Sequence, residues 1–393
     1  MQTKRNEVHE KKAHEKSKMR KLAILLLTLC IIALTRANDS VYFGSGNQLV
    51  PLNENDIAIT REVLTIDLTD DGRTRVDVLY ELWNRGPEKT VLMGFEADAP
   101  SENGDAIAPD GKHPYIHNFH VTLNNKTLAF RTAVVKPDIQ HIGLQKIKNI
   151  KDIMASPDWE NFGSTFVNHK ADSVIEVACA YYFSAHFRQG KNVVHHTYCY
   201  DASFGMGTCF SVPYKLTPAM RWANRKIDDF VLRIRTPRTA KHFCILGDST
   251  FSKAPFRVTE GMGKTRHVKY DEASATEVTL RNGTLEWHCA NFCPRGELNL
   301  RSADILMNWE HENPWLFYDR GKNLIYSIGA VYPITDDKRL LRNLPYAHRG
   351  YVFRDKELDA YFRSLWWYMP DSTWRASARD FTPWEKEAIG KQK

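Results

Sequence analysis

The sequence lacks an apolar run long enough for an ordinary transmembrane helix. Its longest run, LAILLLTLCIIAL, covers residues 22–34, whereas a membrane-spanning helix needs about 20 apolar residues. A basic stretch ending at Lys21 precedes the run and the small residue Ala37 follows it, which is typical of a secretory signal peptide. We therefore predict a signal peptide over residues 1–37, with Met19 as an alternative start. A leader that stays uncleaved, tethering the protein to the membrane, is the other interpretation.

A basic excess is missing from the part that follows the leader. The whole chain has a net charge of +7, but the leader holds nine lysines and arginines against three acids, so residues 38–393 are close to neutral. Nucleic-acid-binding proteins usually carry clustered positive charge that releases counterions from phosphate. We therefore expect no nucleic-acid partner. The length remaining is enough for two or three domains.

Familiar enzyme signatures are absent as well. The sequence contains no nucleophile elbow, H-E-x-x-H or nucleotide-binding glycine pattern, and GMGKT at 261–265 has the wrong spacing for a phosphate loop. We therefore predict no catalytic residue and no cofactor, and a non-enzymatic role is favoured. The alternative is a secreted hydrolase acting on peptide or envelope polymer, with His195 or His196 as the base.

Cysteine is scarce, with seven in the chain and one of them in the leader. The remaining six form an even number, which favours disulfides in an oxidising compartment. Cys199 and Cys209 flank a glycine-containing stretch and could clasp a hairpin, and Cys244 is one candidate partner for Cys289 or Cys293. The disulfide candidates are Cys179, Cys199, Cys209, Cys244, Cys289 and Cys293.

A metal site is the alternative use of these cysteines, with His195, His196 and His288 as further ligands. The paired C-x-x-C knuckles of structural zinc sites are missing. We therefore predict no metal.

What the chain does contain is the two-residue alternation of β-strands. Residues 64–68 and 76–82 alternate around a turn at 70–72, and a second hairpin turns at Asn124-Asn125. Further strands are predicted at 91–95, 173–187, 192–200, 230–234 and 243–246. Short helices are predicted at 144–153 and at 216–227, the latter with Thr217 as N-cap. Residues 38–300 are therefore predicted to be mainly β, with antiparallel sandwich-like sheets and short helical insertions.

The pattern changes after residue 300, where six of the ten tryptophans lie. A helix begins at Asp336 and should bend at Pro345, and a second, from Asp355, carries one apolar face. A third begins at the capping box 382–385. The face of the second helix comprises Leu358, Tyr361, Phe362, Leu365 and Trp366. We predict a small all-α module over 332–393, joined by a connecting segment at 301–331.

The stretch LPYAHRGYVFRDKELDAYFRSLWWYMP, at 344–370, resembles the YARHG domain of bacterial cell-envelope proteins. The resemblance runs over about 333–389. Tyr346, Ala347 and Gly350 match the motif, whereas His348 and Arg349 stand in reverse order. The resemblance implies a fold and an envelope location, and no activity.

The N-terminal part resembles an uncharacterised family of bacterial exported proteins that begin with Ala-Asn-Asp-Ser. The stretches that carry this resemblance are ANDSVYFGSGNQLVPLNENDIAITREVLTID, VDVLYELWNRG, VVHHTYCYDASFG and YKLTPAMRWANRKIDDFVLRI. No activity comes with this family either.

Two interpretations of the 346–350 motif remain open. In the structural one, Gly350 adopts a positive φ after the first helix, and Arg349 caps helix carbonyls or pairs with an acid. In the functional one, a surface binds an anionic or sugar-like polymer. That surface comprises Tyr346, His348, Arg349, Trp366, Trp367 and Tyr368. We therefore predict an exported protein of the periplasm, cell surface or medium that binds an envelope glycan, peptidoglycan or another envelope protein.

Overall fold

A computed structural model describes residues 46–302 apart from short stretches, 317–319, 324–326, and most of 338–390. The chain divides into two units, 1–39 and 40–393, and all described residues belong to the second. The predicted signal peptide, most of the predicted connecting segment and the capping box at 382–385 lie outside the described residues. Within the described part, no helix has the length and apolar character to cross a bilayer.

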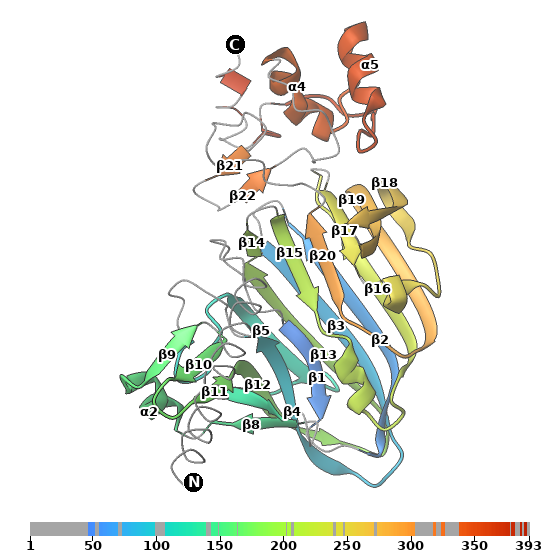
Figure 1. Ribbon diagram of the computed structural model, residues 1–393. Coiled ribbons are helices and arrows are strands. Elements are labelled where there is room, and N and C mark those ends of the chain that lie inside the picture. Colours follow the sequence, from blue (N-terminus) through green and yellow to red (C-terminus); the bar gives the residue numbers. More distant parts are fainter. Residues whose placement is uncertain are drawn as a thin grey trace, which may run out of the picture. The chain divides into compact units, whose positions relative to one another are not determined.

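One twelve-stranded sheet forms most of the β region (Figure 1). In spatial order its strands are β14 (Ser203–Gly205), β15 (Thr208–Tyr214), β20 (Leu298–Ser302), β17 (Lys241–Leu246), β19 (Ala273–Phe292), β16 (Ile227–Arg235), β2 (Ile57–Leu68), β3 (Arg73–Asn84), β13 (Gly190–Asp201), β5 (Ile116–Leu123) and β6 (Lys126–Thr127). The twelfth strand, β18 (Arg257–Tyr270), pairs with β19. Neighbouring strands are antiparallel except β16 and β2, which run parallel.

Smaller sheets accompany it. A five-stranded sheet has the order β1 (Gly46–Pro51), β4 (Lys89–Asp98), β12 (Ala178–Phe187), β7 (Arg131–Asp138) and β8 (Gly143–Lys146). A three-stranded one contains β11 (Ser173–Glu176), β10 (Thr165–Asn168) and β9 (Trp159–Phe162), and β21 (Phe317–Asp319) pairs with β22 (Leu324–Tyr326). Short helical segments are α2 (Ile150–Ala155), η1 (Thr217–Arg221) and α3 (Asp248–Phe251). The prediction of a mainly β protein is confirmed.

The core follows from the alternation of side chains. Along β3 the even-numbered residues, such as Val78 and Tyr80, are buried while the odd-numbered ones are more exposed, because successive side chains point to opposite faces. The hydroxyls of Tyr80 on β3 and Tyr214 on β15 lie 3.3 Å apart, although these strands are distant in the strand order. The large sheet therefore curls until its β15 end faces β3 across a shared core.

Local signals explain two connections. Asn124 and Asn125 have φ values of 50° and 66°, as a two-residue hairpin turn between β5 and β6 requires. At η1, the Glu297 carboxylate accepts hydrogen bonds from the backbone N–H of Leu216, at 2.5 Å, and of Thr217, at 3.1 Å. The predicted helix is therefore a single 3₁₀ turn, and a carboxylate from a distant strand caps it instead of the Thr217 side chain.

The predicted helix over 144–153 is only partly correct. Residues 143–146 form β8, which pairs with β7, and α2 begins at Ile150. Short apolar runs fit a helix or a strand equally well by spacing alone. Here the open edge of β7 decides the outcome, because it offers backbone partners to the first part of the run.

No disulfide joins the cysteine side chains that the structure describes, so the predicted disulfide framework is not shown there. Cys244 on β17 lies opposite Glu277 of β19, and Cys289 is twelve residues farther along that strand. This separation is about 40 Å at 3.3 Å per residue, several times the span of a disulfide. Cys179, Cys289 and Cys293 are free thiols. The Cys209 side chain lies outside the described residues, so the Cys199–Cys209 clasp stays a prediction.

The C-terminal module contains α4 (Lys338–His348) and α5 (Lys356–Ser364) around a core of its own. Asp355 caps α5, accepting hydrogen bonds from the backbone N–H groups of Glu357 and Leu358. The predicted bend at Pro345 is wrong, because α4 continues to His348. Pro345 stands in the last turn, where it removes a single helix hydrogen bond. Burial of Leu344 and Ala347 in the module core offsets that loss.

Candidate functional site

The motif residues of the module form the end of α4. Gly350 has a φ of +81°, and its N–H donates to the Ala347 carbonyl at 2.8 Å. The N–H of Tyr351 donates to the Tyr346 carbonyl at 3.0 Å. These two bonds make a Schellman ending, which needs a left-handed residue at the position of Gly350.

Arg349 lies inside the module and satisfies its backbone. Its side chain is buried, and Nη1 donates to the Pro345 carbonyl at 2.9 Å. Nε and Nη2 donate to the Asp380 carbonyl at 3.1 and 2.7 Å, and the guanidinium lies 4.7 Å from the centre of the Phe381 ring. The guanidinium thus caps one carbonyl of α4, as in the structural interpretation, and bonds a second carbonyl in the segment after α5. It presents no fork to an external anion.

His348 is a half-buried residue beside Trp367, with 4.6 Å between the ring centres. Burial, together with the nearby Arg349, His242 and Lys241, lowers the pKa of His348 to about 3, and burial is the largest of these causes. The imidazole is therefore neutral near pH 7. Trp367 and Tyr368 are also buried, whereas Tyr346 and Trp366 are partly exposed.

The segment after α5 meets the hairpin of β18 and β19 through its backbone. The carbonyls of Trp366 and Tyr368 each accept a hydrogen bond of 3.2 Å from Lys264 Nζ. The Trp367 carbonyl accepts one of 3.4 Å from Thr279. We call the four carbonyls of residues 366–369 the carbonyl row. The row begins two residues after α5, which ends at Ser364, and each of its carbonyl oxygens is a hydrogen-bond acceptor.

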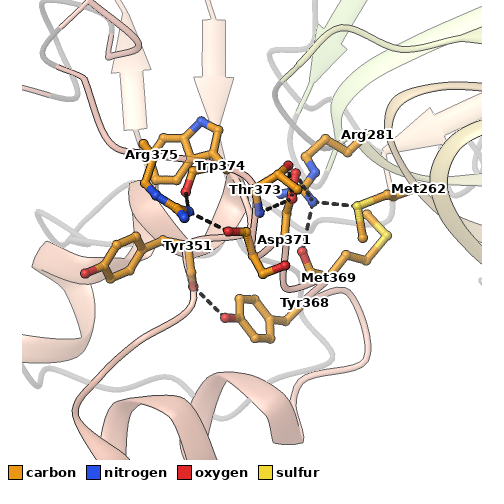
Figure 2. A network of polar contacts seen from close by, with 10 residues as sticks. Met262, Arg281, Tyr351, Tyr368, Met369, Asp371, Thr373, Trp374 and Arg375 are labelled. Carbon is orange, nitrogen blue, oxygen red and sulfur yellow. Dashed lines mark hydrogen bonds and ion pairs between the residues drawn. The ribbon is translucent and has the colours of Figure 1, made fainter.

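The fourth carbonyl of the row binds Arg281 of β19 (Figure 2). Arg281 Nη2 donates to the Met369 carbonyl at 3.0 Å, lies 3.0 Å from Met262 Sδ and 3.8 Å from Asp371 Oδ2. Only 5% of Arg281 is exposed. Burial lowers the pKa of Arg281, and the charge of Asp371 acts in the opposite direction. The pKa of Asp371 is lowered, mainly by a hydrogen bond from the Thr373 hydroxyl, so the pair is ionic.

Trp366 covers a second charged group on the hairpin. Its ring centre lies 4.3 Å from Arg266 Cζ and 5.7 Å from the His242 ring centre. The buried Glu277 carboxylate joins these two side chains, with His242 Nε2 at 2.8 Å and a short contact to Arg266. Burial by itself raises the pKa of Glu277, but the hydrogen bonds from His242 and Arg266 outweigh it, and the net pKa is lowered.

The contacting face of β19 has an unusual composition. Glu277, Thr279 and Arg281 are all buried, and they alternate with core residues Val278 and Leu280. Polar residues at alternate positions normally indicate a solvent-facing side of a strand. Here the C-terminal module covers that side, and nothing local in the sequence reveals it.

The histidines considered for catalysis or metal binding lie apart. His196 is fully buried among Tyr80, Phe95, Phe119 and Tyr198, and burial lowers its pKa to about 3. It cannot serve as a base. His195 Nε2 lies 3.0 Å from Asp77 Oδ1 on the other face of the strand, and His288 pairs with Asp229 at 2.5 Å. In the described part of the chain, no three His, Cys, Asp or Glu side chains gather as a metal site.

Comparison with known families bears on the module first. Residues 335–393 match the YARHG domain. The YARHG domain therefore contains Gly350, the carbonyl row and Asp371, which are the elements that contact Arg281. The resemblance predicted for the N-terminal part stays a prediction, and no curated protein matches the sequence.

Solved structures show a shared fold. A Legionella pneumophila protein described as a "putative nutrient binding protein" is 21% identical, covers 91% of this chain and 100% of its own, and has a TM-score of 0.50. An M1 zinc metallopeptidase from Deinococcus radiodurans is 9% identical over 75% of this chain and 55% of its own, with a TM-score of 0.26. Baculovirus P35 is 9% identical over 63% and 97%, with a TM-score of 0.24. The last two carry no argument at these scores.

Proposed function

We propose that the protein is an exported, non-enzymatic binding protein of the cell envelope in which the YARHG domain is the binding part. In this chain its binding face is seated on the basic hairpin of β18 and β19. One observation carries the proposal: four consecutive carbonyls, at 366–369, accept hydrogen bonds from side chains of that hairpin. A module that only packed by apolar contact would not need such a row.

The charges of the contact support this role. The hairpin contributes Lys264, Arg266 and Arg281, and the YARHG domain contributes the carbonyl row, the Trp366 ring and Asp371. Each of these acceptors attracts cations. The proposed binding face therefore has the opposite charge preference to the surface for an anionic or sugar-like polymer, which was one of the two interpretations of the motif.

The leader and the YARHG match support an envelope location. The Legionella protein with the shared fold is described as nutrient-binding, which fits a binding role for this chain as well. An envelope glycan or peptidoglycan remains a further proposal, for which the partly exposed Tyr346 and Trp366 are the available aromatic groups. Retention of the full chain on cell-wall fragments tests it, and retention unaffected by Trp366→Ala would remove Trp366 from the site.

The double variant Lys264→Met, Arg281→Met in the full chain tests the contact between the carbonyl row and the hairpin. Bonds between charged donors and these carbonyls contribute about 1.5–3 kcal/mol each. We therefore expect hydrogen exchange of the amides at 366–371 to become at least tenfold faster. The matched control is Lys191→Met, Arg233→Met, which removes two ion-paired cations elsewhere on the large sheet. Equal hydrogen-exchange rates in both variants would show that the hairpin does not hold the carbonyl row.

A further inference from the structure

We infer that the YARHG domain of this protein contains a receptor site for a guanidinium group, formed by Gly350, the Met369 carbonyl and Asp371, and that Arg281 is its present occupant. The ligand class is an arginine side chain displayed on a β-hairpin. This inference rests on the proposed function and names the chemistry that the binding face selects.

Space at Gly350 is the first argument. A Cβ atom added there would lie 1.8 Å from Arg281 Nη1, 2.5 Å from Nη2 and 2.5 Å from the Met369 carbonyl oxygen. Two nitrogens of the guanidinium therefore occupy the space beside Gly350 that the side chain of any other residue would fill. The positive φ accounts for a glycine at the end of α4, but it does not account for an arginine seated on it. Gly350 thus has two separate functions in the same turn.

The groups around the Arg281 guanidinium are the second argument. Nη2 meets one carbonyl oxygen, one thioether sulfur and, at 3.8 Å, one carboxylate. Nη1 has no hydrogen-bond partner among the described residues. A compact ammonium is strongly hydrated and needs several oxygen partners, whereas a guanidinium is flat and weakly hydrated. This mixture of one oxygen, a sulfur and a glycine face suits the guanidinium.

Charge is the third argument. The guanidinium site contains the carboxylate of Asp371. This carboxylate accepts hydrogen bonds from the Thr373 hydroxyl at 2.6 Å and the Thr373 N–H at 2.9 Å, which fix its position. Its own N–H donates to the Gly350 carbonyl at 2.7 Å, which ties the carboxylate to the glycine. The two elements of the site are therefore positioned by the YARHG domain and not by the arginine.

Chemical rescue tests the inference in the full chain. Arg281→Ala removes the occupant, and we expect the exchange of amides 366–371 to accelerate about tenfold. Guanidinium chloride at tens of millimolar should then slow that exchange at least threefold, since a ligand that binds the folded form stabilises it. Ammonium chloride and sodium chloride at the same concentration should not. Guanidinium should have no such effect on the unmodified chain, in which Arg281 occupies the guanidinium site.

The outcomes separate the two proposals. Hydrogen exchange that Arg281→Ala leaves unchanged would overturn two proposals together: the contact between the YARHG domain and the hairpin, and the guanidinium site. Faster exchange without rescue would overturn the guanidinium site alone and leave the proposed function standing. Arg281→Lys provides a second measure: exchange as slow as in the unmodified chain would mean that the site accepts any cation, which also overturns the inference.

Discussion

Two buried arginines, Arg349 and Arg281, show how differently the same side chain can be used in two regions of this protein. Arg349 lies within the YARHG domain and makes three hydrogen bonds to carbonyls of that domain. Arg281 belongs to the β region, and its guanidinium makes one hydrogen bond to a carbonyl of the YARHG domain and a longer contact to Asp371. The first arginine completes a small core, and the second joins that core to another region. Burial alone does not distinguish an arginine that stabilises its own region from one that binds another region. The distinction comes from the region to which its hydrogen-bond partners belong.

The largest expected effect concerns Arg349, because its loss leaves two buried carbonyls without donors. Arg349→Ala should destabilise the YARHG domain by about 3 kcal/mol. Hydrogen exchange of the amides of α4 and α5 in the full chain measures this. Arg363→Ala is the control, since solvent screens its surface pair with Asp359, which therefore contributes little to stability. Similar effects of the two substitutions would contradict the structural role of Arg349.

A pair of glycines separates backbone strain from the contact with Arg281. Gly350 and Gly190 have nearly equal φ values, +81° and +83°, but a Cβ at Gly190 would have no neighbour closer than 4.0 Å. Gly190→Ala should therefore cost only the conformational strain, about 1 kcal/mol. Gly350→Ala should cost about 2 kcal/mol more, because Arg281 and the Met369 carbonyl must both move. Unfolding in denaturant measures both, and equal costs would show that Arg281 does not occupy the space.

Each region also contains one histidine with a depressed pKa, His196 in the β region and His348 in the YARHG domain. Above pH 6.5 both are neutral in the folded and unfolded chain. Between pH 6.5 and about 3 only the unfolded chain takes up the proton, so stability falls as the pH falls. His196 should contribute a slope of about 1.4 kcal/mol per pH unit, and the half-buried His348 less, because solvent screens it.

Two substitutions assign these slopes. His196→Phe should flatten the acid dependence of exchange in β13, and His348→Phe that in α4. Measurements at several pH values between 7 and 4 give the slope for each region. An unchanged slope in β13 after His196→Phe would mean that another group controls the acid response there.

The smallest expected effect is on cysteine chemistry, where no change in stability is involved. Burial raises the pKa of Cys179 to about 12, and Cys293 is exposed. Alkylation of the native protein near pH 8 should modify Cys293 and leave Cys179 unmodified, because the thiolate is the reactive form. Mass spectrometry of the labelled peptides reads this directly. Labelling of Cys179 at a comparable rate would contradict its place in the core.

The sequence predicted those features that are encoded by neighbouring residues. Alternation located β2 and β3, the Asn124-Asn125 turn located a hairpin, and the spacing of Leu358 and Phe362 located α5. Each of these signals arises from the geometry of one element, so a single stretch of chain contains it.

The features that the sequence did not reveal depend on distant partners. Glu277, Thr279 and Arg281 have the pattern of a solvent-facing strand, and only the presence of the YARHG domain makes them buried. The helix expected at residue 144 became a strand because β7 had an edge to pair with. The sequence placed Trp366 and Trp367 on a candidate binding surface. In the structure the Trp366 ring covers Arg266 of a hairpin about a hundred residues away, and the Trp367 carbonyl accepts a hydrogen bond from Thr279 of the same hairpin.

The parallel pairing of β2 with β16 sets the time at which the protein can fold. β2 ends at Leu68, and β16 begins at Ile227. At about 5–20 residues per second, a ribosome needs roughly ten to thirty seconds to make the intervening chain. During that interval β2 lacks one of its two neighbours, so the large sheet cannot close. A nascent chain with this topology therefore stays open while its middle part is made, and the closure of its large sheet is slow because it depends on non-local pairing.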